Sequence, residues 1–265
     1  MKLLVDAGDF EILAKPANAA EIIKKAGCTC YQSEDSTTKS PEEFARMLRK
    51  LGHWSMFDHV YASVKIKNCS RAVTHELVRH RLCAFAQEST RYVEQDNLHV
   101  IGPGHRDLNE KFYVPDDPKR HDAYSLSFED MAETVEHFYK TLLSAGWTKE
   151  DARLILPIGT KSEIVMTADF TEWRHVFRLR TQKAAYWEIR VVMVKLLEEF
   201  KKLFPYAFDD FVLAGYDEYG YPYYKIKGFV NNIKELIRRG IKSYKGEVDK
   251  DAITSHIEDF YENNY

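Results

Sequence analysis

The alternation of hydrophobic and polar residues along this 265-residue chain predicts two strands and a larger number of helices. Residues 60–67 place small or branched apolar side chains at every second position, which is typical of a strand with one buried face. Residues 161–168 form a second predicted strand. Over residues 184–204, apolar side chains recur with the spacing of one helix face. These patterns predict an α+β fold, in which mixed helices dominate and surround a small, mainly antiparallel sheet.

Helix-capping residues mark where several of these helices begin. Ser40 is followed by Pro41 and Glu43, a capping-box sequence with proline in the first turn. Gly52 is expected to end this helix. The other predicted helices cover about 70–78, 127–145, 148–156, 169–180, 229–241 and 250–262.

Composition limits the function classes further. The formal net charge of −3 gives no general reason to expect a nucleic acid or an anionic membrane as partner. No apolar run approaches the ~20 residues of a membrane span, and the first residues lack a signal-peptide pattern. The four cysteines form no paired motif, so we expect free thiols in a reducing compartment and a cytoplasmic protein.

One short segment departs from the near-neutral charge of the chain, because it contains several cationic side chains within thirteen positions. Residues 79–91 contain Arg79, His80, Arg81 and Arg91, together with Ser89. These cations repel one another, so an anion must offset them. Nearby glutamates could do so in a salt-bridged helix end. However, arginine forks and a serine hydroxyl suit phosphate, and a compact cluster fits a phosphorylated small molecule better than a long nucleic-acid backbone.

The spacing within this segment resembles a family signature. Arg79-His80-Arg81, seven residues, Ser89, one residue and Arg91 fit the R-H-R-x7-S-x-R motif of flavin-dependent thymidylate synthases. Three further segments are similar to family segments in the same order, namely 52–59 (GHWSMFDH), 152–157 (ARLILP) and Leu179-Arg180 with 185–189 (AYWEI). The resemblance implies a catalytic domain over 1–210, with 211–265 as a C-terminal helical extension of the same domain.

The resemblance implies an FAD-dependent methyltransferase. Such enzymes convert dUMP to dTMP, with methylenetetrahydrofolate as one-carbon donor and NADPH as reductant through bound FAD. They are homotetramers whose active sites combine residues from several subunits. The expected partners are therefore dUMP, a folate, a nicotinamide nucleotide and further copies of the chain, with no metal, nucleic acid or membrane.

The resemblance also assigns roles to individual residues. Arg180 would lie against the uracil ring as the catalytic residue and favour its N3-deprotonated form by charge pairing, and no cysteine nucleophile is needed. The residues expected to bind dUMP are Glu76, Leu77, Val78, Arg79, Gln87, Glu88, Ser89, Thr90, Arg91, Arg153 and Arg180. Those expected to bind FAD are His53, Ser55, Arg79, His80, Arg81, Gln87, Asp169, Phe170, Thr171 and His175.

At several positions the chain departs from the family pattern. Gln87 stands where the family often has glutamate, and it can still form hydrogen bonds but carries no charge. The other departures are Cys28 and Cys30 for arginine and serine near the flavin, Asp169-Phe170-Thr171 for Asn-Ala-Arg, and His175 for asparagine.

Two other functions are compatible with parts of the sequence. A metal-dependent nucleotide phosphohydrolase could draw ligands from His53, Asp58, His59, His75 and His80, although these residues lack the usual ligand spacing. A nucleic-acid binder could combine the basic segment with a surface rich in tyrosine and phenylalanine.

Overall fold

The computed structural model describes residues 1–32, 38–95, 98–113 and 125–227 and divides into two units, Met1–Trp173 and Arg174–Tyr265. The first unit contains β1 (Lys2–Val5), β2 (Asp9–Ala14), α1 (Ala19–Tyr31), α2 (Pro41–Leu51), η1 (Trp54–His59), β3 (Tyr61–Ser70), α3 (Arg71–Leu77), β4 (Ala84–Gln87), β5 (His99–Gly102), β6 (Phe112–Tyr113), β7 (Ser125–Leu126), α4 (Phe128–Ser144), α5 (Lys149–Ala152), η2 (Arg153–Ile155) and β8 (Lys161–Asp169). Helix α6 (Phe170–Arg180) begins there and continues into the second unit, which adds α7 (Trp187–Leu203), α8 (Pro205–Phe208), β9 (Phe211–Tyr216) and β10 (Pro222–Ile226).

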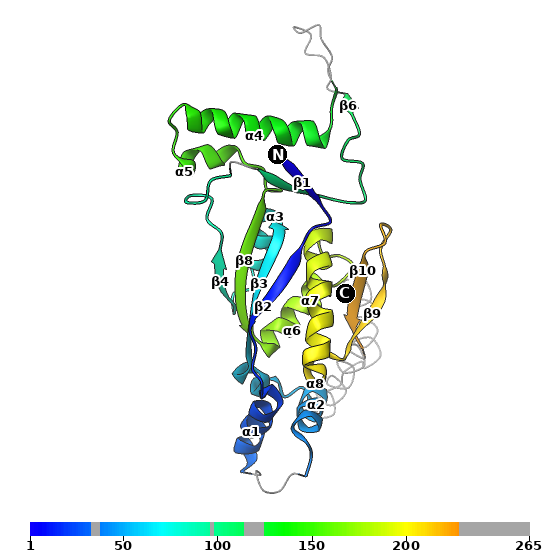
Figure 1. Cartoon of the computed structure of the whole chain (residues 1–265). Coiled ribbons are helices and arrows are strands. Elements are labelled where there is room, and N and C mark those ends of the chain that lie inside the picture. Colours follow the sequence, from blue (N-terminus) through cyan, green and yellow to red (C-terminus); the bar gives the residue numbers. More distant parts are fainter. Residues whose placement is uncertain (33–37, 96–97, 114–124, 228–265) are drawn as a thin grey trace, which may run out of the picture. The chain divides into compact units, whose positions relative to one another are not determined.

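A four-stranded antiparallel sheet in the order β2-β3-β8-β4 is the centre of the first unit (Figure 1). Its two central strands are the two that the sequence predicts, and both predictions are confirmed. In β3, Ala62, Val64 and Ile66 are buried, whereas Tyr61 is exposed. Burial at every second position therefore fixes which face of β3 packs into the core.

Short strands complete the sheets, and the sequence pattern does not predict them. β1 pairs with β5 in parallel, with Lys2 opposite His99, and β6 pairs with β7. β4 pairs with β8. Each of β1, β4 and β5 has four residues, too few for alternation to distinguish a strand from a turn. The prediction of helices with a mainly antiparallel sheet is confirmed, with β1–β5 as the parallel pair among the described strands.

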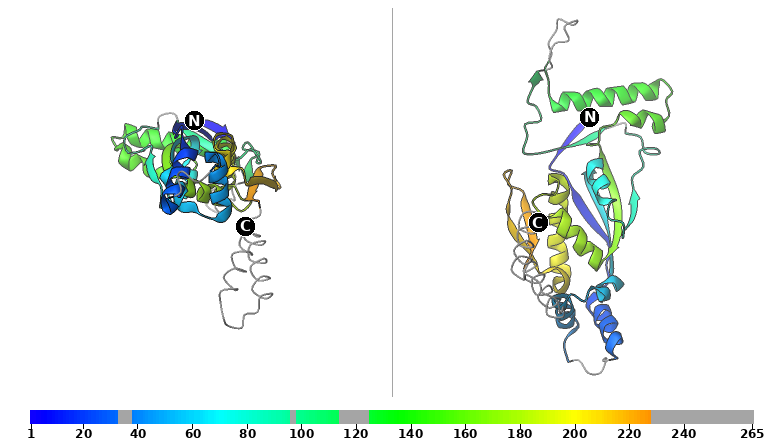
Figure 2. Two further views of the ribbon diagram at one scale, coloured as in Figure 1. Left: turned by 90° about the horizontal axis from the view of Figure 1, so that it is seen from below. Right: turned by 180° about the vertical axis from the view of Figure 1, so that it is seen from behind.

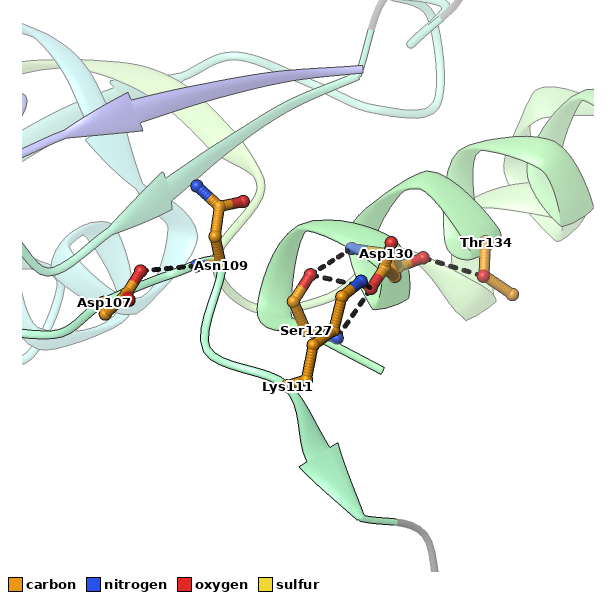
Figure 3. A network of polar contacts seen from close by, with 6 residues as sticks. All are labelled: Asp107, Asn109, Lys111, Ser127, Asp130 and Thr134. Carbon is orange, nitrogen blue, oxygen red and sulfur yellow. Dashed lines mark hydrogen bonds and ion pairs between the residues drawn. The ribbon is translucent and has the colours of Figure 1, made fainter. Parts of the chain in front are cut away.

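The predicted helix caps are confirmed at hydrogen-bond level. The Ser40 hydroxyl accepts from the backbone N–H of Glu43 at 3.2 Å, and the Ser40 N–H donates to the Glu43 carboxylate at 3.0 Å. Gly52 ends α2 with φ of 77°, a left-handed conformation that glycine adopts readily. Ser127 and Asp130 form a second capping box at the start of α4, and Lys111 pairs with the same carboxylate (Figure 3).

Helices pack on the sheet and on each other within the first unit. α1 and α2 lie side by side (Figure 2), with Gly27 of α1 close against the Phe44 ring. The Ser70 hydroxyl accepts from the Val73 N–H and so starts α3 directly at the end of β3. Trp173 in α6 is fully buried, and its indole N–H donates to the Ala62 carbonyl of β3 at 3.1 Å. The start of α6 is thereby fixed against the sheet.

The second unit is built around α7. The rings of Phe177, Phe200, Phe208 and Phe211 meet edge to face, a favourable aromatic geometry. The predicted helix over 184–204 begins at Trp187, because the Ala185 N–H bonds the Gln182 carbonyl in a preceding turn.

The described part of the C-terminal segment differs from the helical extension that the sequence predicts. Residues 211–226 form the β9–β10 hairpin, whose turn uses Gly220 at φ of 85° and the Asp217 carboxylate as acceptor for the Tyr219 and Tyr221 N–H groups. The predicted helices at 229–241 and 250–262 lie outside the described residues. None of the helices in the described ranges combines the length and the apolar content needed to cross a bilayer.

Candidate active site

The R-H-R segment forms a tight turn between α3 and β4. The Arg79 N–H bonds the Glu76 carbonyl, the His80 N–H bonds the Leu77 carbonyl, and the Cys83 N–H bonds the His80 carbonyl. Arg79 and Arg81 are exposed, whereas His80 is only 4% exposed. In the chain, two exposed arginines therefore flank one buried histidine.

His80 contacts a carboxylate from α6. Its Nδ1 lies 3.4 Å from Oε1 of Glu172, and both side chains are buried. The Cys83 thiol lies 3.9 Å from the same oxygen. Burial, and then the nearby Asp169, raise the pKa of Glu172 above its usual range. Burial, followed by the charges of Glu172 and Asp169, raises the pKa of Cys83 to about 12, so this thiol stays protonated at neutral pH.

The structure brings two other segments expected to bind FAD next to each other. The Thr171 hydroxyl donates to the Trp54 carbonyl at 3.2 Å, and Trp54 lies between the exposed His53 and Ser55 in the chain. Asp169 accepts from the Glu172 N–H at 2.7 Å and so caps α6. Burial raises the pKa of Asp169, and the charge of Asp58 contributes in the same direction.

Phe170 and Leu77 differ from the other predicted site residues because their side chains are fully buried. Neither residue therefore exposes any surface to a ligand in the single chain. Of the neighbours of Leu77, Glu76 is partly buried and Val78 is exposed.

Ser89, Thr90 and Arg91 form a second turn, just after β4. The Ser89 hydroxyl accepts from the Arg91 N–H at 3.3 Å, and its carbonyl accepts from the N–H groups of Tyr92 and Val93. Thr90 is buried beneath the turn. These bonds hold the Arg91 side chain on the outside, where it is 51% exposed.

Arg91 and Arg153, which sequence comparison assigns to one phosphate group, meet at a single residue. Nε of Arg91 lies 2.9 Å from Oε2 of Glu150. Nε of Arg153 donates to the Glu150 backbone carbonyl at 3.1 Å. The turn after β4 and the α5–η2 segment therefore each contribute an arginine that contacts Glu150, one at its carboxylate and one at its backbone carbonyl.

Gln87 and Glu88 connect this turn to the sheet. Nε2 of Gln87 donates to the Thr74 hydroxyl at 2.8 Å and lies 3.4 Å from the Ser162 hydroxyl. The Glu88 N–H bonds the Glu163 carbonyl of β8, and its carboxylate accepts from the side chain of Gln95 at 3.2 Å. The Gln87 amide nitrogen, which we expected at a uracil or flavin edge, thus links β4 to α3 and β8.

His175 and Arg180 lie on the part of α6 that belongs to the second unit. Nδ1 of His175 lies 3.2 Å from a guanidinium nitrogen of Arg178. Burial, and then the charges of Arg178 and Arg180, lower the pKa of His175. Its imidazole is therefore held in the neutral form in this basic surrounding.

The cysteines and the proposed metal ligands can also be placed. All four cysteines are free thiols, with Cys28 and Cys69 buried. Of the five proposed metal ligands, His80 lies beside another possible ligand, the Glu172 carboxylate, within a group of ligand side chains close enough to share an ion. Among the described residues, the other four, His53, Asp58, His59 and His75, join no such group.

Sequence reasoning did not assign a site role to Glu150 or Glu172. Nε of Arg153 bonds a backbone carbonyl three residues earlier, whereas the Glu150 carboxylate pairs with Arg91 from a distant segment, which no local pattern predicts. Glu172 lies in the first turn of the predicted helix over 169–180, and its contact with His80 depends on the packing of α6 against the turn after α3.

Comparison with known proteins identifies relatives along most of the chain. A family model described as "Thymidylate synthase complementing protein" matches residues 11–206. The chain is 33% identical over 210 residues to a flavin-dependent thymidylate synthase of Corynebacterium diphtheriae, covering 77% of this chain and 83% of the relative. It is 40% identical over 152 residues to the Pyrococcus abyssi enzyme of the same name, covering 57% and 59%.

The fold is also similar to that of a solved structure. PolB, a UMP/dUMP methylase from Streptomyces cacaoi bound with 5-Br UMP, superposes with a TM-score of 0.61 at 23% identity, over 79% of this chain and 95% of PolB. Since the family model covers most of the chain and the corynebacterial relative aligns over most of its length, this chain belongs to the flavin-dependent thymidylate synthases, a family of FAD-dependent methyltransferases.

Proposed function

We propose that this chain catalyses the reductive methylation of dUMP to dTMP, using methylenetetrahydrofolate as the one-carbon donor and NADPH as the reductant through bound FAD. Its relatives carry the name of this reaction. The structural observation that supports it best is the convergence of Arg91 and Arg153 at Glu150, beside the Ser89 turn. Two guanidinium groups, a serine hydroxyl and turn N–H groups are donors suited to a phosphate monoester.

The residues around His80 suit FAD. Exposed Arg79 and Arg81 flank the buried His80, so cationic groups are available for the pyrophosphate, with an imidazole between them. The contact between Thr171 and Trp54 brings the 53–55 segment beside the start of α6. In the proposal these segments hold FAD, which supplies the transfer of reducing equivalents when bound.

Other residues of the chain bind and polarise dUMP. Ser89, Thr90, Arg91 and Arg153 hold the phosphate, while Glu76 lines the nucleotide, and Gln87 braces the turn from β4 through Thr74 and Ser162. Arg180 lies against the uracil ring, where a guanidinium favours the N3-deprotonated form and raises the electron density at C5. No cysteine nucleophile takes part, and Cys83, with a pKa of about 12, is unsuited to such a role.

The proposal includes a homotetramer in which each active site combines residues from several subunits. Mass photometry of the purified protein tests the assembly, and a monomeric species at working concentration would contradict it.

The activity is tested by incubating the purified protein with FAD, dUMP, methylenetetrahydrofolate and NADPH and measuring dTMP by mass spectrometry. Omission of each component in turn gives the controls. We expect dTMP only in the complete mixture, with deuterium from labelled NADPH recovered in the product. A protein that binds FAD but forms no dTMP in this mixture would overturn the proposal.

A further inference from the structure

Two ion pairs join the Ser89–Glu94 turn to α5. Arg91 pairs with Glu150 at 2.9 Å, and Lys149 pairs with Glu94 at 3.1 Å. The side chains are about half exposed, with Arg91 at 51% and Glu150 at 47%. Both pairs are therefore accessible to solvent, and an anion from solution can reach the guanidinium group.

Glu150 contacts both arginines that the proposed function assigns to the phosphate. Its carboxylate pairs with Arg91, and its backbone carbonyl accepts from Arg153. A carboxylate and a phosphate oxygen pair use the same guanidinium donors. The Glu150 carboxylate occupies Nε of Arg91, so a phosphate that binds the guanidinium group through Nε must replace that carboxylate.

We infer that Glu150 is an internal competitor of the substrate phosphate, which occupies Arg91 in the ligand-free enzyme and releases it when dUMP binds. This inference rests on the proposed function. The apparent affinity for dUMP equals the intrinsic affinity multiplied by the fraction of molecules in which Arg91 is not paired with Glu150. Since exposed ion pairs are weak, the reduction is about two- to fivefold.

The test compares two substitutions that change the charge equally. Glu150→Gln frees Arg91, whereas Glu94→Gln leaves the Arg91–Glu150 pair intact and serves as the matched control. dUMP binding is measured by calorimetry with the FAD-loaded protein at low and high salt, and deoxyuridine serves as a ligand without phosphate. Loaded flavin and a thermal melt establish that each variant is folded.

We expect Glu150→Gln to bind dUMP about two- to fivefold more tightly than the wild type at low salt. This advantage should narrow at high salt, because exposed charges are screened. Glu94→Gln should change dUMP affinity by less than about 1.5-fold. Deoxyuridine should bind all three proteins equally.

The opposite results overturn the inference. Weaker dUMP binding by Glu150→Gln means that the carboxylate aims Arg91 at the phosphate, and equal tightening by Glu94→Gln means a general effect of charge. If Glu150→Gln binds deoxyuridine more tightly by the same factor as dUMP, the effect does not involve the phosphate, and the inference is also contradicted. If wild-type protein binds dUMP and forms dTMP, but Glu150→Gln binds dUMP no more tightly than wild type, only the inference fails. If no protein binds dUMP, the proposed function fails as well.

Discussion

The two turns at either end of β4 hold their charged groups in opposite environments. In the turn before β4, His80 and Glu172 are 4% and 7% exposed. In the turn after β4, the side chains of Arg91 and Glu150 are 51% and 47% exposed. The first pair is therefore governed by desolvation and protonation, and the second by screening and exchange with solutes.

This difference corresponds to different tasks. A buried imidazole with a carboxylate at 3.4 Å is held in one position, which suits a tightly held cofactor. An exposed guanidinium with a weak partner can exchange that partner for an incoming phosphate, which suits a substrate that enters and leaves at each turnover. The following experiments separate the two environments, beginning with the largest expected effect.

The Cys83 thiol should be the clearest marker of the buried turn. Burial and the neighbouring acids raise its pKa to about 12 from a reference of 9.0, so its thiolate fraction at pH 8 falls by roughly 10³-fold. We expect iodoacetamide to modify it roughly 10³-fold more slowly than an ordinary thiol, as measured by peptide mass spectrometry over time.

Exposed Cys30 gives an internal reference in the same sample. Glu172→Gln should speed the modification of Cys83, because Glu172 contributes to the raised pKa. Rapid modification of Cys83 in the wild type would show that the turn before β4 is open, and the contrast between the two turns would not hold.

Loss of Arg91 should affect the substrate and spare the cofactor. Arg91→Ala removes a charge-assisted contact worth about 1.5–3 kcal/mol, so we expect dUMP affinity to fall about 10- to 100-fold. FAD affinity should stay within about twofold, because the side chain belongs to the other turn. Calorimetry for dUMP and flavin fluorescence for FAD measure the two effects.

Lys149→Ala is the matched control for Arg91→Ala. It removes a cation from the same pair of elements without touching Arg91, so both affinities should change less than twofold. Equal losses of dUMP and FAD in Arg91→Ala would contradict the separate roles of the two turns.

The free energy of unfolding should depend on pH through the titration of Glu172. Burial raises its pKa in the folded protein, so its contribution to stability is complete below the usual glutamate pKa and is lost as pH rises through the raised value. Glutamine has no such titration. We expect the free energy of unfolding of Glu172→Gln to increase relative to wild type as pH rises above about 4.5, in urea titrations at several pH values.

Glu172→Ala provides the comparison, because it also removes the hydrogen-bonding group next to His80. The buried His80 imidazole then loses this hydrogen-bonding partner, and the loss costs about 1–3 kcal/mol. The free energy of unfolding should therefore be lower at every pH. If Glu172→Gln instead lost stability relative to wild type as pH rose, the carboxylate would be stabilised by His80 more than it is penalised by burial.

The two turns also differ in how far the sequence alone predicts them. Alternation over 60–67 and the Ser40 capping box predict local structure, because neighbouring residues decide it, and both predictions are confirmed. The contact of Arg153 with the Glu150 backbone carbonyl is local, since the two residues are three positions apart. In contrast, the pairing of His80 with Glu172 joins residues 92 positions apart, and no local pattern encodes it. The side chain of Gln87 turns toward Thr74 and Ser162 for the same reason, since its partners come from α3 and β8.

The smallest expected effect is on stability at the turn after β4. Glu150→Gln removes an ion pair that is about half exposed, and such pairs contribute about 0–1 kcal/mol. We expect its free energy of unfolding to stay within about 0.5 kcal/mol of wild type, and to be insensitive to salt within that margin. Urea unfolding at low and high salt measures this. A loss of several kcal/mol would mean that the Glu150 contacts hold the fold, and a carboxylate needed for folding could not be released to make room for a phosphate at each turnover.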